Sequence, residues 1–199
     1  MGVLATHFGI VPVTARDISS FRRVAISGLP FGVGAVLANG AILLKPGTME
    51  PDAEHDAKVE VMLKSWRPIL DDLIQQVHDL RQNQNIQARL VASNVDLPAY
   101  LVVKASEVFW SGEAGKTVRN ILQAAGLRTA CLGREVQGLP PGLSKRMGVE
   151  AFARRFHDGA PPLLGFGDHQ EDLGFLKLAE YMVIPRISFL AERFHDSAP

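Results

Sequence analysis

Two aspartates four positions apart, Asp168 and Asp172, follow a short apolar run at residues 163–166. We expect this run to form a short buried strand, with Gly167 permitting a sharp turn after it. Open α/β sheets place ligands at the carboxyl ends of their strands, so both carboxylates should lie at such an end. Carboxylate oxygens suit a hard cation such as Mg²⁺, which also keeps several waters. The spacing therefore predicts a Mg²⁺ site, although helix caps and loop acids also produce it.

Thr14 and Lys145 occupy positions that suit a phosphate. Thr14 follows an apolar run at residues 10–13, expected to be a strand, and precedes a helix with Asp17 as its N-cap and Gly28 just past its end. A helix N-terminus offers free N–H groups, and the Thr14 hydroxyl adds a donor. Lys145 opens another expected helix and could supply a point charge to a phosphate or a buried carboxylate. A solvated lysine and a threonine that only ends a strand are the alternatives.

Four short motifs in a fixed order give these residues a context. They are Val-Thr-Ala-Arg at Thr14, Ala-Asn-Gly-Ala at Asn39, Ser-Lys at Lys145, and Gly-Asp-x-x-x-Asp ending at Asp172. Together they resemble the haloacid dehalogenase-like (HAD) hydrolase superfamily. The likeness is to its sugar-phosphate phosphatases, of the sucrose-phosphatase and mannosylphosphoglycerate-phosphatase kind, and it covers nearly the whole chain.

The resemblance implies an α/β fold in which a Rossmann-like HAD core carries an inserted α+β cap domain. The core would comprise residues 1–50 and 140–199, and the cap would comprise residues 51–139. In the superfamily such a cap covers the active site and selects substrates. Within it, apolar residues recur at steps of three and four over residues 59–80, which predicts one long amphipathic helix that Pro68 kinks.

The rest of the cap is expected to contain three strands, one helix and a return linker. The strands are expected at residues 86–93, 100–105 and 128–132, the helix at 118–125 and the linker at 138–142. Lys104, Glu107, Trp110 and Lys116 lie at strand ends or loops and could supply hydroxyl partners and a stacking surface for a sugar. Ordinary solvated positions are the alternative for all four.

The resemblance also implies roles for individual residues. Thr14 would bind the oxygens of the transferred phosphoryl group, and Lys145 would pair with the phosphate and the nucleophile. Asp168 would ligate Mg²⁺, and Asp172 would support the metal or its waters. The residues implied to contact the substrate are Thr14, Arg16, Asn39 and Lys145. One departure is local, because the superfamily often has Asn before the last acid and this chain has Glu171.

The first catalytic motif of the superfamily, Asp-x-Asp-x-Thr, is absent, since no Asp-x-Asp occurs in the 199 residues. Its first aspartate is the nucleophile and its second is the acid/base. Phosphoryl transfer needs an in-line nucleophile, so this chain as given is expected to be inactive. The strand that carries the motif would lie between the strands ending at Thr14 and Asp168, and its loss would leave unpaired backbone groups on both. Asp168 and Asp172 would then be neighbouring like charges, which raises the pKa of one of them.

Three functional interpretations follow. The first is a Mg²⁺-dependent phosphatase of a sugar phosphate or similar small phosphomonoester, seen here as an N-terminally truncated product or a misassigned start. The second is a catalytically dead relative that still binds a phosphorylated sugar in a regulatory or binding role. Retention of Thr14, Lys145, Asp168 and Asp172 favours the first interpretation. The third, and least favoured, is an enzyme whose first strand comes from another chain.

Composition limits the partners and the location. Twenty-one basic and 21 acidic residues balance, which leaves no electrostatic footprint for nucleic acid or an anionic membrane. The longest apolar stretch, residues 32–44, is too short to span a bilayer. No secretory leader is recognised, and the single Cys131, expected to be a small core residue, suits a reducing cytoplasm. The oligomeric state stays open.

Overall fold

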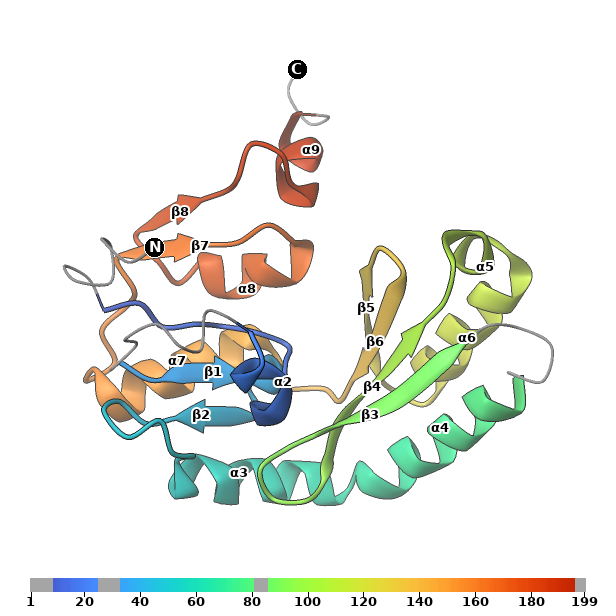
Figure 1. The fold of residues 1–199 in the computed structure, drawn as a ribbon, viewed down its shortest axis with the longest axis horizontal. Helices are drawn as coiled ribbons and strands as arrows, with labels where there is room; N and C mark the ends of the chain where they lie inside the picture. Colours follow the sequence, from blue (N-terminus) through green and yellow to red (C-terminus); the bar gives the residue numbers. More distant parts are fainter. Residues whose placement is uncertain (1–8, 25–32, 81–85, 196–199) are drawn as a thin grey trace.

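The chain folds into a core lobe and a cap lobe that face each other (Figure 1). The structure is a computed structural model, and it describes residues 9–24, 33–80 and 86–195. Within those ranges, no helix is long and apolar enough to cross a lipid bilayer. The helix that follows Thr14 ends at Arg22, earlier than the end just before Gly28 that the sequence predicts, and Gly28 itself lies outside the described residues.

The first part of the core is a buried hairpin with an extended segment beside it. Strands β1 (Ala35–Leu37) and β2 (Ile42–Leu44) pair antiparallel, and every one of their side chains is buried. Residues 10–14 run parallel to β1 and are joined to it by an isolated bridge between Val13 and Val36. The strand expected at residues 10–13 is therefore an extended segment that is paired to β1 at one bridge.

Helix α2 (Ile18–Arg22) follows this segment, and its N-cap is the predicted one. The Asp17 carboxylate accepts a 2.7 Å hydrogen bond from the Ser20 N–H, which satisfies a backbone donor that the first turn leaves free. Phe21 is the buried residue of this helix. The N-cap at Asp17 thus fixes where the chain turns away after Thr14.

The second part of the core follows the cap in the sequence. It contains α7 (Lys145–Phe156), β7 (Leu164–Phe166), α8 (Leu173–Leu176), β8 (Tyr181–Val183) and α9 (Phe189–His195). Strands β7 and β8 pair in parallel and form a two-stranded sheet of their own. A short 3-10 helix, η4 (Gln170–Asp172), lies between β7 and α8.

Apolar side chains, rather than a continuous sheet, join the two parts of the core. One buried cluster combines Val36 of β1 and Leu43 of β2 with Phe152 of α7 and Leu176 of α8. Among the described residues, no backbone ladder links β7 to the segment at residues 10–14. In Figure 1 that segment lies on the side of β1 that faces β7 and α8.

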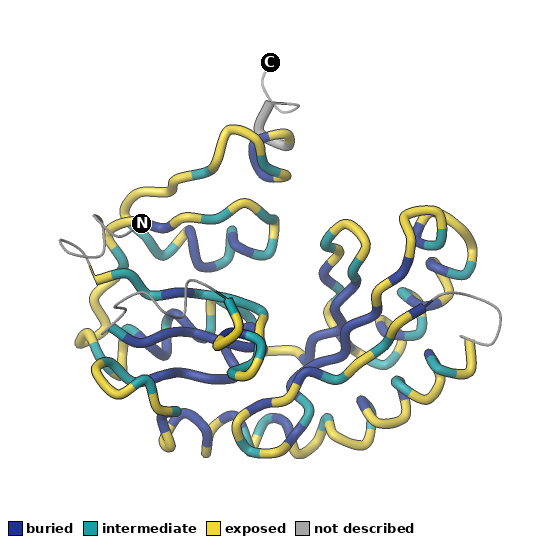
Figure 2. Tube along the Cα trace, viewed as in Figure 1, coloured by how far each residue is buried: buried dark blue, intermediate teal, exposed yellow. Residues whose placement is uncertain are grey.

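Strand β7 is more exposed than the sequence predicts. Leu164 is 42% exposed and Phe166 is 59% exposed, whereas Gly165 between them is buried. Gly165 faces α8, because a Cβ there would lie 2.9 Å from Leu176 Cδ2. The prediction of a buried strand was wrong because one face of β7 has no described neighbour to cover it (Figure 2).

The cap is built on a four-stranded antiparallel sheet. Its strands are β3 (Gln87–Ala92), β4 (Pro98–Lys104), β6 (Glu135–Leu139) and β5 (Arg128–Leu132), in that order across the sheet. Helices α4 (Arg67–Leu80), α5 (Glu107–Ser111) and α6 (Glu113–Ala124) pack on one face through a buried cluster that includes Leu73, Leu101 and Leu122. The opposite face belongs to the cluster that contains Leu37 of the core, together with Tyr100 and Val102.

Three expectations for the cap need correction. The expected single long helix is two helices, α3 (Ala53–Lys64) and α4, and Pro68 lies in the first turn of α4, where a missing N–H is tolerated. The expected return linker at residues 138–142 begins inside strand β6, which ends at Leu139, and a Cβ at Gly138 would lie 3.0 Å from Leu127 Cδ1. Cys131 is exposed rather than buried.

Candidate active site

The loop that follows β7 is folded around Asp172. Its Oδ2 atom accepts hydrogen bonds from the backbone N–H groups of Asp168 and His169, each at 3.1 Å. Gly167 makes this fold possible, because a Cβ there would lie 2.6 Å from the Asp172 Cβ. A glycine is therefore required at this position for the carboxylate to reach back to the loop.

Lys145 reaches the same carboxylate from α7. Its Nζ donates to Asp172 Oδ1 at 2.6 Å, and the two side chains are only 15% and 7% exposed. Ser144 caps α7 by accepting from the Met147 N–H at 3.1 Å, which places Lys145 in the first turn. The structure thus brings together two residues that the sequence predicts for one site. Because both Asp172 oxygens are engaged, this carboxylate holds the loop and Lys145 in position.

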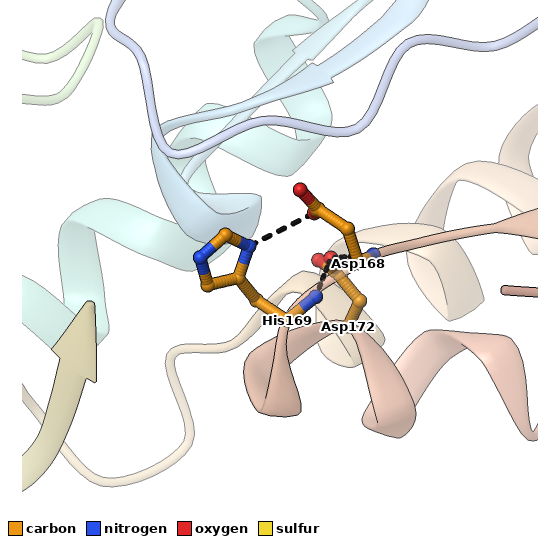
Figure 3. A group of neighbouring side chains, drawn as sticks. All are labelled: Asp168, His169 and Asp172. Carbon is orange, nitrogen blue, oxygen red and sulfur yellow. Dashed lines mark hydrogen bonds and ion pairs between the residues drawn. The ribbon is translucent and has the colours of Figure 1, made fainter. Parts of the chain in front are cut away.

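Asp168 and His169 form a pair at the open side of the loop (Figure 3). His169 Nδ1 donates to Asp168 Oδ1 at 2.9 Å, and the imidazole stacks on the Phe189 ring at an interplanar angle of 11°. This hydrogen bond lowers the pKa of Asp168, so the rise expected from a neighbouring like charge is not found at this residue.

His169 is a site residue that the sequence analysis did not identify as one. Asp168, His169 and Asp172 each present a potential ligand atom, and these atoms all lie within 4.8 Å of one another. The only sequence signal for His169 is its position next to Asp168, and adjacency alone does not fix the direction of a side chain. Its stacking on Phe189 fixes that direction here.

Asn39 lies in the short turn η2 (Ala38–Gly40) between β1 and β2, as the Asn-Gly motif predicts. Its φ of 54° and the φ of 97° at Gly40 are left-handed conformations, which Asn and Gly tolerate best. The turn touches the start of α7, because a Cβ at Gly148 would lie 2.6 Å from Gly40 Cα. This close approach of two glycines places Asn39 beside the helix that begins with Lys145.

A buried histidine, His55, forms a hydrogen bond to this turn. His55 Nε2 lies 2.8 Å from the carbonyl oxygen of Gly40, which accepts its hydrogen bond. Burial lowers the pKa of His55, which favours the neutral ring. His55 therefore anchors the turn without bringing a charge into the core.

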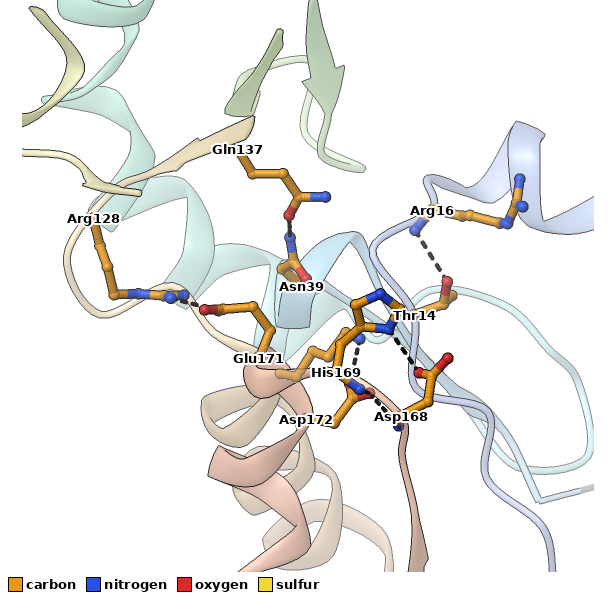
Figure 4. A network of polar contacts seen from close by, with 10 residues as sticks. Thr14, Arg16, Asn39, Arg128, Gln137, Asp168, His169, Glu171 and Asp172 are labelled. Atoms are coloured by element: carbon orange, nitrogen blue, oxygen red, sulfur yellow. Dashed lines mark hydrogen bonds and ion pairs between the residues drawn. The ribbon is translucent and has the colours of Figure 1, made fainter. Parts of the chain in front are cut away.

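Thr14 and Arg16 differ in how they face the site. The Thr14 carbonyl accepts from the Asn39 N–H at 3.2 Å, which ties the segment at residues 10–14 to the turn. Figure 4 shows Thr14 beside Asp168 and His169, whereas the Arg16 guanidinium points away from them. The Thr14 hydroxyl accepts from the Arg16 N–H at 3.3 Å, so its own proton is available to a ligand.

The cap contacts the core through side chains from two of its strands. Arg128 of β5 forms an ion pair with Glu171, the residue that departs from the superfamily pattern. Gln137 of β6 accepts from Asn39 Nδ2 at 2.9 Å in a buried contact (Figure 4). Glu171 thus connects the loop that carries Asp168 to the cap.

Of the four cap residues considered for sugar contact, one lies on the core-facing side of the sheet. Lys104 pairs there with Glu135 at 3.0 Å. Trp110 is buried in the helix-side cluster, and its indole N–H donates to the Arg134 carbonyl at 3.0 Å. Glu107 and Lys116 form ion pairs with Arg134 and Glu113 respectively. Sequence position near a strand end therefore did not predict which side chains face the core.

The donor set at the loop fits part of a Mg²⁺ site. The Asp168 carboxylate is 56% exposed, and one of its oxygens has no partner in the described contacts of that carboxylate. The Asp172 carboxylate already accepts hydrogen bonds from Lys145 and from two backbone N–H groups. A hard cation requires oxygen ligands, so Asp168 suits it, and further carboxylates would be needed to complete the protein ligands.

Several solved structures are similar to this chain over nearly its whole length. The sucrose-phosphatase from Synechocystis in complex with sucrose and phosphate has a TM-score of 0.64 at 16% identity, over 98% of this chain and 77% of that chain. A trehalose-6-phosphate phosphatase related protein has a TM-score of 0.57 at 12% identity, over 98% and 81%. The C-terminal domain of Candida albicans trehalose-6-phosphate phosphatase has a TM-score of 0.62 at 14% identity, over 89% and 62%.

At the level of sequence, no protein-family model and no curated protein matches the chain. At these low identities the structural similarities concern the fold. They agree with the α/β architecture of two core parts and a cap and with the motif order in the sequence. The chain has the HAD-like fold of the sugar-phosphate phosphatases, as its motifs predict.

Proposed function

We propose that this chain forms the core and cap of a Mg²⁺-dependent HAD-like phosphatase that removes the phosphate from a sugar phosphate. The observation that supports this most is that Lys145 of α7 reaches Asp172 in the loop that carries Asp168, beside Thr14 and beneath the cap. The similarity to a sucrose-phosphatase bound to sucrose and phosphate supports a phosphorylated sugar as substrate.

In this proposal the chain's own residues bind and orient the phosphate. The Thr14 hydroxyl donates to a phosphoryl oxygen, and the Lys145 ammonium compensates the negative charge of the phosphate. Asp172 holds Lys145 and the loop in place. Asp168 would hold Mg²⁺, which when bound neutralises charge on the phosphoryl oxygens.

The nucleophile is the part of the reaction that these residues do not supply, since no Asp-x-Asp occurs in the 199 residues. The backbone groups along two sheet edges indicate where a strand that carries the nucleophile could lie. The Thr14 N–H donates to the Val36 carbonyl at 2.9 Å, and the Pro12 carbonyl accepts from the Val36 N–H at 2.8 Å. The backbone N–H and carbonyl of Val13 therefore point away from β1. On the other side, the Gly167 N–H donates to Val183 at 3.3 Å.

The same alternation applies to β7, so the backbone groups of Leu164 and Phe166 point away from β8. A strand between β7 and the segment at residues 10–14 would pair with both edges and would end beside Asp168. We propose that such a strand, from polypeptide outside these 199 residues, carries the nucleophilic carboxylate. A parallel sheet tolerates unpaired inner edges poorly, which supports the proposal.

The first experiment is the intact mass of the protein purified from its native source. We expect a mass above 21.7 kDa, with an Asp-x-Asp-x-Thr sequence in the added peptide. The longer protein should hydrolyse p-nitrophenyl phosphate with Mg²⁺, and Asp168→Asn should abolish this activity because it removes a metal ligand. The 199-residue chain should show no turnover.

Two outcomes would contradict the proposal. Turnover by the 199-residue chain that is lost in Asp168→Asn would show that the additional strand is not needed. A native mass that matches 21.7 kDa, together with no turnover, would favour the second candidate function, a nucleophile-free relative that binds sugar phosphates. The absence of an Asp-x-Asp sequence is the observation that supports this second candidate.

A further inference from the structure

The start of α9 is fixed against the loop that follows β7. The Leu190 N–H donates to the carbonyl oxygen of Asp168 at 3.1 Å, and the Leu190 side chain is 1% exposed in the buried cluster that also contains Leu176. Ser188, which precedes the helix, accepts from the Ala191 N–H at 3.2 Å and so satisfies a backbone donor of the first turn. The position of α9 relative to Asp168 is therefore set by its backbone and by a buried side chain.

Phe189, the neighbour of Leu190 in α9, holds the ring of His169. The two rings are stacked with their centroids 6.4 Å apart and an interplanar angle of 11°. Phe189 is 45% exposed and the His169 side chain is 42% exposed, so the packing of a buried core does not fix the imidazole. Stacked rings prefer a small set of arrangements, so Phe189 limits the directions that the His169 ring can take.

His169 in turn orients the Asp168 carboxylate (Figure 3). Its Nδ1 atom lies 2.9 Å from Asp168 Oδ1. An ionised carboxylate only accepts hydrogen bonds, so the shared proton is on Nδ1, in the neutral ring as in the cation. This contact engages Oδ1, and the Asp168 side chain is 56% exposed, so Oδ2 is the oxygen that a cation can reach.

A fixed orientation of Asp168 favours Mg²⁺ binding. Mg²⁺ demands a nearly ideal octahedral arrangement of oxygens, so a carboxylate that is already held in one orientation loses less freedom when it binds the ion. Hydrogen bonds from neighbouring groups to ligating side chains typically account for about 10–100-fold in metal affinity. The contacts of α9 and His169 are of this kind, because they act on Asp168 through its carbonyl and its Oδ1 atom.

We propose that His169 is a positioning residue for the metal ligand Asp168, and that Phe189 of α9 positions His169. Helix α9 thereby contributes to metal affinity, although neither Phe189 nor Leu190 offers a side-chain ligand atom. In this assignment His169 is not itself a ligand, even though a nitrogen of its ring lies within 4.8 Å of both carboxylates of the loop. The inference rests on the proposed function, because it assumes that Asp168 binds Mg²⁺.

The test measures the dissociation constant of Mg²⁺ alone by calorimetry, with the protein in the form that the intact-mass measurement identifies. His169→Ala should raise this constant about tenfold, because it removes the hydrogen bond to Asp168. His169→Asn should restore most of the affinity, since its amide can still donate to Asp168. Phe189→Leu should raise the constant about threefold through the loss of the stacked ring, whereas Phe189→Tyr, which keeps the ring, should leave it unchanged.

His157 provides a matched control, and Mn²⁺ provides a second readout. The exposed His157 ring lies beside Phe152 with the centroids 5.6 Å apart, at the end of α7 opposite to Lys145. His157→Ala therefore removes the same ring from a phenylalanine contact and should leave the Mg²⁺ dissociation constant unchanged. With Mn²⁺ in place of Mg²⁺, electron spin echo spectroscopy detects a nitrogen bound directly to the metal, and we expect none.

The outcomes separate this inference from the proposed function. If Asp168→Asn weakens Mg²⁺ binding but His169→Ala does not, the positioning role is overturned and the metal site stands. If Asp168→Asn leaves Mg²⁺ binding unchanged, the metal site is overturned, and the positioning role with it.

Three further results would overturn the positioning role. The first is a coordinated nitrogen that disappears in His169→Ala, since His169 would then be a ligand. The second is an equal loss of affinity in His157→Ala and His169→Ala. The third is unchanged affinity in Phe189→Leu, which overturns the part assigned to α9 and also decides the test if His169→Ala does not fold.

Discussion

At the scale of single residues, the candidate site depends on how the charge of one buried carboxylate is compensated. Asp172 accepts from two backbone N–H groups and from Lys145, so each of its oxygens has a partner. A buried charge without partners is strongly unfavourable, which explains why Lys145 and the loop occur as one unit. Asp168 is left more exposed, and its carboxylate accepts from His169 Nδ1.

The corresponding prediction concerns the Lys145–Asp172 pair. Lys145→Met should lower the free energy of unfolding by about 3 kcal/mol, because it leaves the Asp172 carboxylate buried without its cation. Adding Asp172→Asn should recover part of this loss, because the amide oxygen can still accept from the loop. Urea unfolding followed by tryptophan fluorescence measures both values. Lys116→Met is the control and should cost less than about 1 kcal/mol. Equal losses in Lys145→Met and the control would contradict the buried-pair interpretation.

At the scale of elements, the site depends on how closely η2 approaches α7. Gly40 and Gly148 allow that approach, since a Cβ at Gly148 would lie 2.5 Å from Val36 Cγ1 and 2.6 Å from Gly40 Cα. His55 adds a hydrogen bond to the Gly40 carbonyl. The contact sets the position of Asn39 relative to Lys145, which no local feature of either element would do.

Gly148→Ala should therefore separate η2 from α7. We expect a loss of about 2 kcal/mol in the free energy of unfolding, typical of overpacking against backbone. Gly174→Ala in α8 is a suitable control, because the nearest atom to its added Cβ is the Arg146 Cβ at 3.3 Å. This contact is tight but milder than those at Gly148, and the gain in helix propensity offsets part of it, so Gly174→Ala should cost clearly less than Gly148→Ala. If thermal unfolding gives the same midpoint for both variants, the close contact of η2 and α7 does not hold in solution.

At the scale of the whole molecule, the core is held together by side chains where a continuous sheet would use backbone hydrogen bonds. Strands β7 and β8 pair only with each other among the described strands, and they carry the exposed apolar residues Leu164, Phe166 and Tyr181. The cap sheet has four paired strands and two buried faces. The two lobes should accordingly differ in local stability.

Hydrogen exchange measured by mass spectrometry tests this difference. In the 199-residue chain, amides of β7 and β8 should exchange faster than amides of β4 and β6, because opening β7 and β8 exposes little additional apolar surface. In a longer protein with a strand beside β7, the protection of β7 should rise while that of β4 stays the same. Equal protection of β7 and β4 in the 199-residue chain would contradict the view that the core sheet is incomplete.

The sequence by itself determined the local features of this protein. Asp17 could be identified as an N-cap because a cap depends on residues within one turn. The Asn39–Gly40 turn and the acidic loop after an apolar strand were predictable for the same reason. The order of four short motifs then predicted the HAD-like fold, which the similar solved structures confirm.

Only the tertiary structure decided which side chains meet in the site. Asn39 and Gln137 are 98 positions apart, and Arg128 and Glu171 are 43 positions apart, so their contacts depend on how the cap folds back over the core. The exposure of Cys131 and of β7 was likewise mispredicted, because apolar character predicts burial only where another element covers the residue. Local sequence specifies caps, turns and strands through neighbouring residues, whereas long-range packing specifies which of their side chains share a site.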